Sequence, residues 1–372
     1  MRDFSGVRRI VVKVGTNLLA DESGIDRSRI GKLVDQIAAL RKKGIQVLVV
    51  SSGAVGLGAK ALGHESAVRY IALRQACAAI GQPVLMDAWQ QAFSRHNLLC
   101  SQILITRSVL NNRRSYNNLR TAVQTLLELG VVPVFNENDV VSTAEIGNVF
   151  GDNDRMSALI ASKIDASLLV LLTDIDGLYT GNPKTDENAK MIPELREIDD
   201  TVFSWASGKG STFSTGGMKT KLMAARIAQD GGCGTVIASG YEDDILIHIM
   251  EGEEKGTYIL PLDRIKQRER WIINTPSAGS IIVDDGAAEA LLKHKSLLPS
   301  GIVSVEGVFH EGDVVDVKKE DGKTIMKAVT SFNSSEILLI KGHSSKDINA
   351  MIGENHKVVF RPEDTAVSYE QL

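Results

Sequence analysis

Short amide and carboxylate side chains follow an apolar run near the middle of the chain. The run, residues 131–135, is typical of a buried parallel strand. Two polar groups follow it: Asn136, Glu137, Asn138 and Asp139, and then Asp152, Asn153 and Asp154. Such side chains at the C-terminal end of a strand suit a ligand that carries both an amine and a carboxylate, because open α/β sheets bind ligands there. A solvated loop, closed by Asp154 as the N-cap of a helix over 156–163, explains the same residues.

Three junctions between an apolar run and a helical pattern place glycine beside lysine, serine or threonine. They are Lys13-Val14-Gly15-Thr16, Ser51-Ser52-Gly53-Ala54 and Thr215-Gly216-Gly217-Met218-Lys219-Thr220-Lys221. Glycine lets a ligand approach the backbone, and free N–H groups at the start of a helix bind phosphate. A lysine within an apolar strand, such as Lys13, is unfavourable to bury unless it meets an anion. Ordinary turn chemistry explains each junction alone, but the three together favour a phosphate site.

Phosphoryl transfer is the chemistry that these residues suit. It needs mainly positioning and neutralisation of the transferring group, which lysines, backbone N–H groups and Mg²⁺ can supply. Thr173 and Asp174 end another apolar run, and Asp174 is suited to a ribose or to positioning a lysine. The Gly- and Ser-rich stretch 204–214 suggests a flap over the site. The sequence contains no GxxxxGK[ST] phosphate loop, no GxGxxG dinucleotide motif and no Ser/His/Asp arrangement.

The elements that would position these residues alternate between strand and helix patterns. Strands are predicted over 9–14, 46–51, 101–106, 131–135, 168–173 and 235–239. A helix is predicted over 26–43, with Asp26 as its N-cap and Gly44 as its stop. This alternation predicts an α/β fold, a three-layer αβα sandwich with a mostly parallel sheet. At 372 residues, the chain is long enough for a second domain.

The C-terminal part has an all-β pattern that predicts a small β-barrel-like domain. Strands are expected over 280–283, 314–318, 325–332, 337–341 and 357–360, with one helix over 286–293. The predicted boundaries are a first domain over 1–258, a linker over 259–277, a second domain over 278–360 and a tail over 361–372. In the segment 261–279, Arg264, Lys266, Arg268 and Arg270 stand two apart, which predicts an extended linker with its cations on one side.

Charge and cysteine content restrict the partners and the compartment. The net charge is −4, and residues 278–372 hold 10 Lys and Arg against 15 Asp and Glu, so attraction to nucleic acid or to acidic membranes is not expected. Cys77, Cys100 and Cys233 have no metal-ligand spacing and are best explained as free thiols in a reducing compartment. No segment is long and apolar enough to cross a membrane, so a cytoplasmic location is predicted.

The motifs, taken in order, resemble those of the glutamate 5-kinases of the amino-acid kinase superfamily. They are KVGT, SSGAVGLG, NENDVVSTAEI, GDND, LLTDIDGLYT and TGGMKTK. The resemblance covers nearly the whole chain, including a basic linker that ends in RERW and a C-terminal part similar to a PUA domain. It implies ATP-dependent phosphorylation of the γ-carboxylate of L-glutamate, with Mg²⁺, to give L-glutamyl 5-phosphate in the first step of proline biosynthesis.

The resemblance also implies roles for individual residues. Lys13 and Lys221 would stabilise the transferring phosphoryl group, and Asp154 would orient both lysines. Ser52, Asp139 and Asn153 would hold glutamate, with Asp139 on its ammonium. ATP would contact Lys13, Thr173, Asp174 and the segment Thr215, Gly216, Gly217, Met218, Lys219, Thr220 and Lys221. No metal ligand is assigned to the protein, and the stretch 146–150 is longer than expected for the family.

Further implications of the resemblance concern regulation and partners. Proline is implied as an inhibitor, and the protein is expected to be a homo-oligomer, either a dimer or a tetramer. Glutamyl phosphate reductase is implied as a partner. Three alternatives stay open from the residues: a kinase of the same fold acting on acetylglutamate, aspartate or UMP, an RNA-binding protein that uses the PUA-like domain, and a non-catalytic amino-acid sensor. The acidic balance of residues 278–372 argues against RNA binding.

Overall fold

The computed structural model divides the chain into two compact units, residues 1–264 and 265–372. It describes residues 1–21, 24–64, 68, 70–141, 153–183, 185–206, 217–262, 267–343 and 358–367. The predicted strand–helix alternation and the all-β pattern are thus found in separate units. Among the described residues, no helix is both long and apolar enough to cross a membrane.

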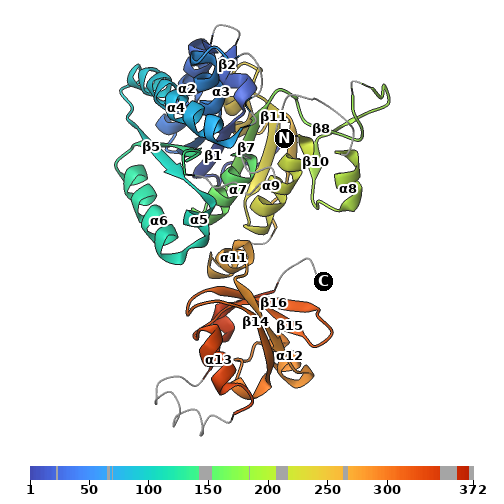
Figure 1. The fold of residues 1–372 in the computed structure, drawn as a ribbon. Helices are drawn as coiled ribbons and strands as arrows, with labels where there is room; N and C mark the ends of the chain where they lie inside the picture. The colour runs from blue at the N-terminus through green and yellow to red at the C-terminus, as the bar shows by residue number, and fades with distance from the viewer. Residues whose placement is uncertain are drawn as a thin grey trace. The chain divides into compact units, whose positions relative to one another are not determined.

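The first unit is built on an eight-stranded sheet (Figure 1). Its strands, in spatial order, are β10 (Glu194–Leu195), β12 (Thr257–Ile259), β11 (Gly234–Ser239), β7 (Leu168–Thr173), β1 (Arg9–Val14), β4 (Gln46–Ser51), β6 (Val132–Glu137) and β5 (Cys100–Ile105). Neighbouring strands are parallel except β11 and β12. The predicted strands of this unit are confirmed to within two residues.

Helices cover both faces of this sheet, as the predicted αβα sandwich requires. One face packs against α1 (Thr16–Leu19), α2 (Arg27–Lys42), α3 (Ala54–Ala61), α4 (Ile71–Ser94) and α10 (Ile245–Met250). The other packs against α5 (Arg107–Asn111), α6 (Arg113–Glu128), α7 (Asn153–Lys163), α8 (Asp200–Trp205) and α9 (Met218–Asp230). Alternate residues of β1 face opposite cores, so Val12 lies in the first core and Val11 in the second.

Two short hairpins complete the unit, β2 (Ala20–Asp21) with β3 (Gly24–Ile25) and β8 (Leu178–Tyr179) with β9 (Met191–Ile192).

The second unit holds a five-stranded sheet. Its order is β14 (Ile302–Gly307), β13 (Gly279–Val283), β15 (Val314–Lys319), β16 (Thr324–Val329) and β17 (Thr365–Ala366). The unit also contains α11 (Gln267–Asn274), α12 (Asp285–Leu292), α13 (Ser334–Ile340), and the short 3₁₀ helices η1 (Pro299–Gly301) and η2 (Pro362–Asp364). Its separate apolar core is built around Ile281, Val315 and Phe360.

Several sequence predictions for the second unit are wrong. The predicted strand over 337–341 is wrong: residues 337–340 belong to helix α13, because Asn333 and Glu336 form a capping box that starts a helix there. The predicted extended linker is helical over 267–274, where α11 buries Trp271 and Ile272. The predicted strand 325–332 ends at Val329, and of 357–360 the described part forms only an isolated bridge from Phe360 to Leu297. Strands β14 and β17 were not predicted.

Helices α3 and α4 touch each other through glycines, and this contact shapes the ligand edge of the sheet. A Cβ built on Gly58 would lie 1.8 Å from the Cys77 carbonyl oxygen, and one on Gly81 would lie 1.9 Å from the Ala54 carbonyl oxygen. Such distances are impossible for real atoms, so the backbones can approach this closely only where a side chain is absent. Glycine is therefore required at this crossing.

We expect Gly58→Ala to destabilise the first unit by about 3 kcal/mol or more, because the added methyl group must push α3 away from α4. The matched control is Gly56→Ala on the same helix, where a Cβ meets no atom within 4 Å. That change should leave stability unchanged or raise it by up to about 1 kcal/mol, because alanine favours helix. Thermal and urea unfolding of both variants measure the difference, and equal midpoints would contradict the packing account.

Candidate active site

The C-terminal ends of parallel strands bring most of the predicted residues to one edge of the large sheet. Lys13 lies in β1, Ser52 directly follows β4, and Thr173 ends β7. Strand β1 lies between β4 and β7, so these ends are neighbours in space. The chain builds β4 and β6 on one side of β1, and β7 and β11 on the other. A crevice at such a reversal of strand order is the usual ligand site of an open α/β sheet.

A buried ion cluster joins Lys13, Asp154 and Lys221. The Lys13 Nζ lies 2.6 Å from Asp154 Oδ1, and the Lys221 Nζ lies 3.3 Å from Asp154 Oδ2. Thr220 Oγ1 donates a hydrogen bond of 3.2 Å to the same Oδ2. Asp154 is 0% exposed, and the two lysines are 8% and 5% exposed. The sheet face that carries Lys13 is covered by α7 and α9, which supply Asp154 and Lys221.

The electrostatics of this cluster keep Asp154 ionised. Burial favours the neutral acid, but the charges and hydrogen bonds of Lys13 and Lys221 outweigh it and lower the pKa of Asp154. The bland alternative for Asp154 was an N-cap of a helix. Helix α7 begins at Asn153, so Asp154 lies within its first turn, and its carboxylate is paired with the lysines. Two lysines converge on one buried carboxylate, an arrangement that suits an incoming anion.

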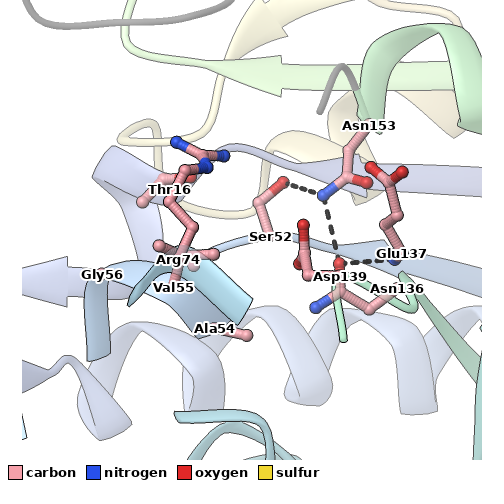
Figure 2. A pocket seen from close by; sticks show the side chains of 11 residues that line it. Thr16, Ser52, Ala54, Val55, Gly56, Arg74, Asn136, Glu137, Asp139 and Asn153 are labelled. Carbon is pink, nitrogen blue, oxygen red and sulfur yellow. Dashed lines mark hydrogen bonds between the residues drawn. The ribbon is translucent and has the colours of Figure 1, made fainter. Parts of the chain in front are cut away.

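A pocket of about 180 Å³ opens next to this cluster (Figure 2). Its described lining comes from the start of α1, the start of α3, the first turn of α4, the end of β6 and the start of α7. The lining residues are Thr16, Ser52, Gly53, Ala54, Val55, Gly56, Arg74, Asn136, Glu137, Asp139 and Asn153. Gly53 caps α3 with φ +104°, a conformation that favours glycine, and it leaves the start of the helix without a side-chain cap.

Asn153 connects the pocket to the ion cluster. Its Nδ2 donates to Ser52 Oγ at 2.7 Å, to the Ser51 carbonyl at 3.1 Å and to Asn136 Oδ1 at 3.2 Å. Its own Oδ1 is buried and has no hydrogen-bond partner among the described residues. A buried acceptor without a partner is unfavourable, so a donor from a bound ligand would be stabilising there.

Neighbouring side chains hold this amide network in place. Asn136 Nδ2 donates to Gln82 Oε1 at 2.7 Å, and Trp89 Nε1 donates to Ser51 Oγ at 3.0 Å. Gln82 and Trp89 both belong to α4, so this helix positions the base of the pocket. The network orients Asn153 and Ser52 before any ligand enters.

Asp139 contributes a carboxylate with an unusual pKa to the pocket. Burial and the neighbouring Glu137 raise its pKa to about 6, and Arg74 acts in the opposite direction. Asp139 therefore changes charge close to neutral pH. Arg74 is close enough for its charge to be felt at Asp139, although it comes from a distant part of the chain.

The residues expected to contact nucleotide lie at the C-terminal end of β7 and at the start of α9, the helix that also carries Lys221. Asp174 accepts hydrogen bonds from Thr173 Oγ1 at 3.0 Å and from Asn17 Nδ2 at 3.4 Å. Burial acts to raise the pKa of Asp174, but these bonds and the charge of Lys221 lower it. Helix α9 starts at Met218 after Gly217 and has no side-chain cap, so its first N–H groups can donate hydrogen bonds to an anion.

Some predicted positions cannot be placed in the site. Thr215 and Gly216, the suggested flap from 207 onward, and Asp152 with the loop from 142 fall outside the described residues. Lys219 is exposed on the first turn of α9. Sequence reasoning missed Arg74, Gln82 and Trp89, because they lie in a long helix without any strand-end motif. Only their place in the fold connects them to the site.

Comparison with known proteins identifies the family. The model of the "Amino acid kinase family" matches residues 8–239, and that of the "PUA domain" matches residues 279–352. A glutamate 5-kinase from Methanosarcina mazei is 42% identical over an alignment that covers 99% of this chain and 98% of that protein. One from Trichlorobacter lovleyi is 46% identical, covering 93% of each.

Among solved structures, a UMP kinase from Ureaplasma parvum is 18% identical with a TM-score of 0.49, covering 68% of this chain and 99% of that one. The family models, the full-length relatives, the αβα sandwich and the second unit with its separate five-stranded sheet agree. The chain therefore belongs to the amino acid kinase family and, within it, to the glutamate 5-kinases that carry a C-terminal PUA domain.

Proposed function

We propose that this chain transfers the γ-phosphoryl group of ATP to the γ-carboxylate of L-glutamate, producing L-glutamyl 5-phosphate and ADP in the first step of proline biosynthesis. The observation that carries the proposal is the buried Lys13–Asp154–Lys221 cluster beside an amide-lined pocket. The full-length glutamate 5-kinase relatives support the choice of glutamate as acceptor.

The chemistry needs no general base, because the acceptor is already a carboxylate. An oxygen of the γ-carboxylate attacks the γ-phosphorus, and the bond to the oxygen that bridges the β- and γ-phosphates breaks as ADP leaves. Lys13 and Lys221 stabilise the negative charge on the transferring group, and Asp154 fixes where their Nζ atoms lie. Because the three groups are preorganised and almost fully buried, their charges act on the transition state with little screening.

Substrate binding is assigned to the pocket. Asn153 and Ser52 lie next to the ion cluster and suit the reacting end of glutamate, whereas Asp139 suits its ammonium. Thr173, Asp174 and the α9 segment Gly217, Met218, Lys219, Thr220 and Lys221 would hold ATP, together with Thr215 and Gly216. A kinase acting on acetylglutamate would gain nothing from Asp139, because its substrate has no ammonium.

Mg²⁺ is proposed as part of the nucleotide complex. The described residues contain no group of three or more His, Cys, Asp or Glu that could hold a metal ion. This fits Mg²⁺, which binds chiefly through substrate phosphates and water and needs only one or two carboxylates from the protein. Asp174, which directly follows β7, would be a carboxylate available to the ion, and the ion would neutralise phosphate charge.

The remaining expectations from the sequence and from the resemblance stay predictions. They are a cytoplasmic location, a dimer or tetramer, inhibition by proline, glutamyl phosphate reductase as a partner, and the absence of RNA binding by the PUA domain.

The direct assay gives purified protein ATP, Mg²⁺ and glutamate and traps the acyl phosphate with hydroxylamine. A hydroxamate signal that depends on glutamate is expected, with weak or no signal from N-acetylglutamate, aspartate or UMP. N-acetylglutamate and UMP lack the ammonium, and aspartate is one methylene too short for its side-chain carboxylate to reach the lysines while its ammonium stays at Asp139. No glutamate-dependent product, or faster turnover of N-acetylglutamate, would refute the proposal.

Lys221→Ala should lower kcat by about 10²- to 10³-fold, because it removes one of the two charges on the transferring phosphoryl group. The KM for glutamate should stay within a few-fold, and the variant should fold, since Asp154 remains paired with Lys13. Arg226→Ala, further along α9, is the control and should behave like the wild type. A large rise in KM with unchanged kcat would contradict the role given to Lys221.

The raised pKa of Asp139 predicts the acid limb of the pH profile. Only the ionised carboxylate attracts an ammonium, so kcat/KM for glutamate should fall as the pH drops through about 6. Asp139→Asn should raise the KM by about 10- to 100-fold and abolish this limb, with little change in kcat. Asp243→Asn, whose exposed carboxylate pairs with Lys32, is the control and should change neither quantity. If the fall in kcat/KM at low pH persists unchanged in Asp139→Asn, another group causes it.

A further inference from the structure

A cation of unassigned purpose lines the substrate pocket. Arg74 lies in the first turn of α4 and is half-buried at the pocket wall. Figure 2 shows its side chain on one side of the pocket, across from the group formed by Ser52, Asn153 and Asn136. Among the described residues it forms no ion pair, although two carboxylates line the same pocket. Arginine without a partner beside a polar cavity is suited to bind an anion.

The charges of the pocket indicate which anion would bind to Arg74. The described lining contains Glu137 and Asp139 as anions, and Arg74 as the one cation. The proposed substrate has two carboxylates, and the reacting one lies toward Lys13 and Lys221. The other, the α-carboxylate, must enter a pocket that already holds two carboxylate side chains. Without a positive group nearby, this carboxylate would be repelled by the two side chains, and nothing would compensate for the loss of its water.

The geometry of an α-amino acid matches the pair formed by Arg74 and Asp139. The ammonium and the α-carboxylate are bonded to the same carbon, so their protein partners must lie close to each other. Arg74 and Asp139 line the same pocket of about 180 Å³, and the charge of Arg74 acts to lower the pKa of Asp139. Asp139 would take the ammonium, and the planar guanidinium of Arg74 would take the carboxylate with two parallel hydrogen bonds.

The fold holds Arg74 in this place. Its helix, α4, is locked to α3 through Gly58 and Gly81, and Gln82 of the same helix supports Asn136 at the base of the pocket. The arginine and the amide network are therefore carried by one rigid element, which fixes the distance between the two ends of a bound amino acid.

We propose that Arg74 binds the α-carboxylate of the amino-acid substrate and thereby makes the site select α-amino dicarboxylates over simpler carboxylates. This inference rests on the proposed glutamate kinase function. It makes Arg74 a specificity-determining residue rather than a contributor to phosphoryl transfer.

The test compares L-glutamate with 4-aminobutyrate, which keeps the amine and the carboxylate to be phosphorylated but lacks the α-carboxylate. Arg74→Met should raise the KM for glutamate by about 10- to 100-fold and leave kcat within about threefold. The kcat/KM for 4-aminobutyrate should change by no more than about twofold, so that discrimination between the two substrates collapses. Arg74→Lys should recover only part of the loss, because it keeps the charge but not the planar fork.

Arg114→Met is the matched control, because Arg114 is an exposed arginine in the first turn of α6. It should leave both substrates unaffected. An unchanged KM for glutamate in Arg74→Met overturns the inference, and so does an equal loss for both substrates, which would show a structural role. A fall in kcat alone would place Arg74 at the phosphoryl group and also overturn it. A wild-type protein without glutamate-dependent turnover would instead refute the proposed function.

Discussion

The pairing of one buried carboxylate with two buried lysines is the constraint on which the rest of this structure depends. Asp154 has no exposed surface, and Lys13 and Lys221 are nearly as buried. Removing one partner from a buried ion pair leaves an uncompensated charge, which is strongly destabilising. Both lysines converge on this one carboxylate, and the proposed function places the transferring phosphoryl group beside their Nζ atoms. The same arrangement therefore gives a stable fold and a site prepared for a phosphoryl group.

The large sheet makes this cluster possible by bringing distant segments together. Lys13 comes from the central strand β1, and α7 and α9 bring Asp154 and Lys221 to the same face. Helices α3 and α4 cover the opposite face and meet through their glycines, and their first turns line part of the pocket. Asn153 and Asp154 are adjacent in the chain, yet one serves the pocket and the other the lysines. In the proposed function, the first turn of α7 therefore carries both a substrate-binding residue and the residue that orients the two lysines.

The sequence predicted the parts of this account that depend on local pattern. Apolar runs such as 168–173 and 46–51 are buried on both faces, so they could be recognised as strands of a parallel sheet. The run 337–341 was misassigned because the capping box at Asn333 and Glu336 overrides its strand-like composition. Arg74 could not be found from spacing, because its relation to Asp139 exists only once α4 packs beside β6. The loop before Asn153, which was expected to be longer than is usual in the family, lies outside the described residues.

The most direct test of the central claim is a crystal structure with L-glutamate and a non-hydrolysable ATP analogue bound. The account predicts that the γ-carboxylate lies beside Asn153 and Ser52, facing a γ-phosphate analogue held by the Nζ atoms of Lys13 and Lys221, with Asp154 still paired to both. Glutamate bound outside this pocket, or a γ-phosphate group away from the two lysines, would contradict it.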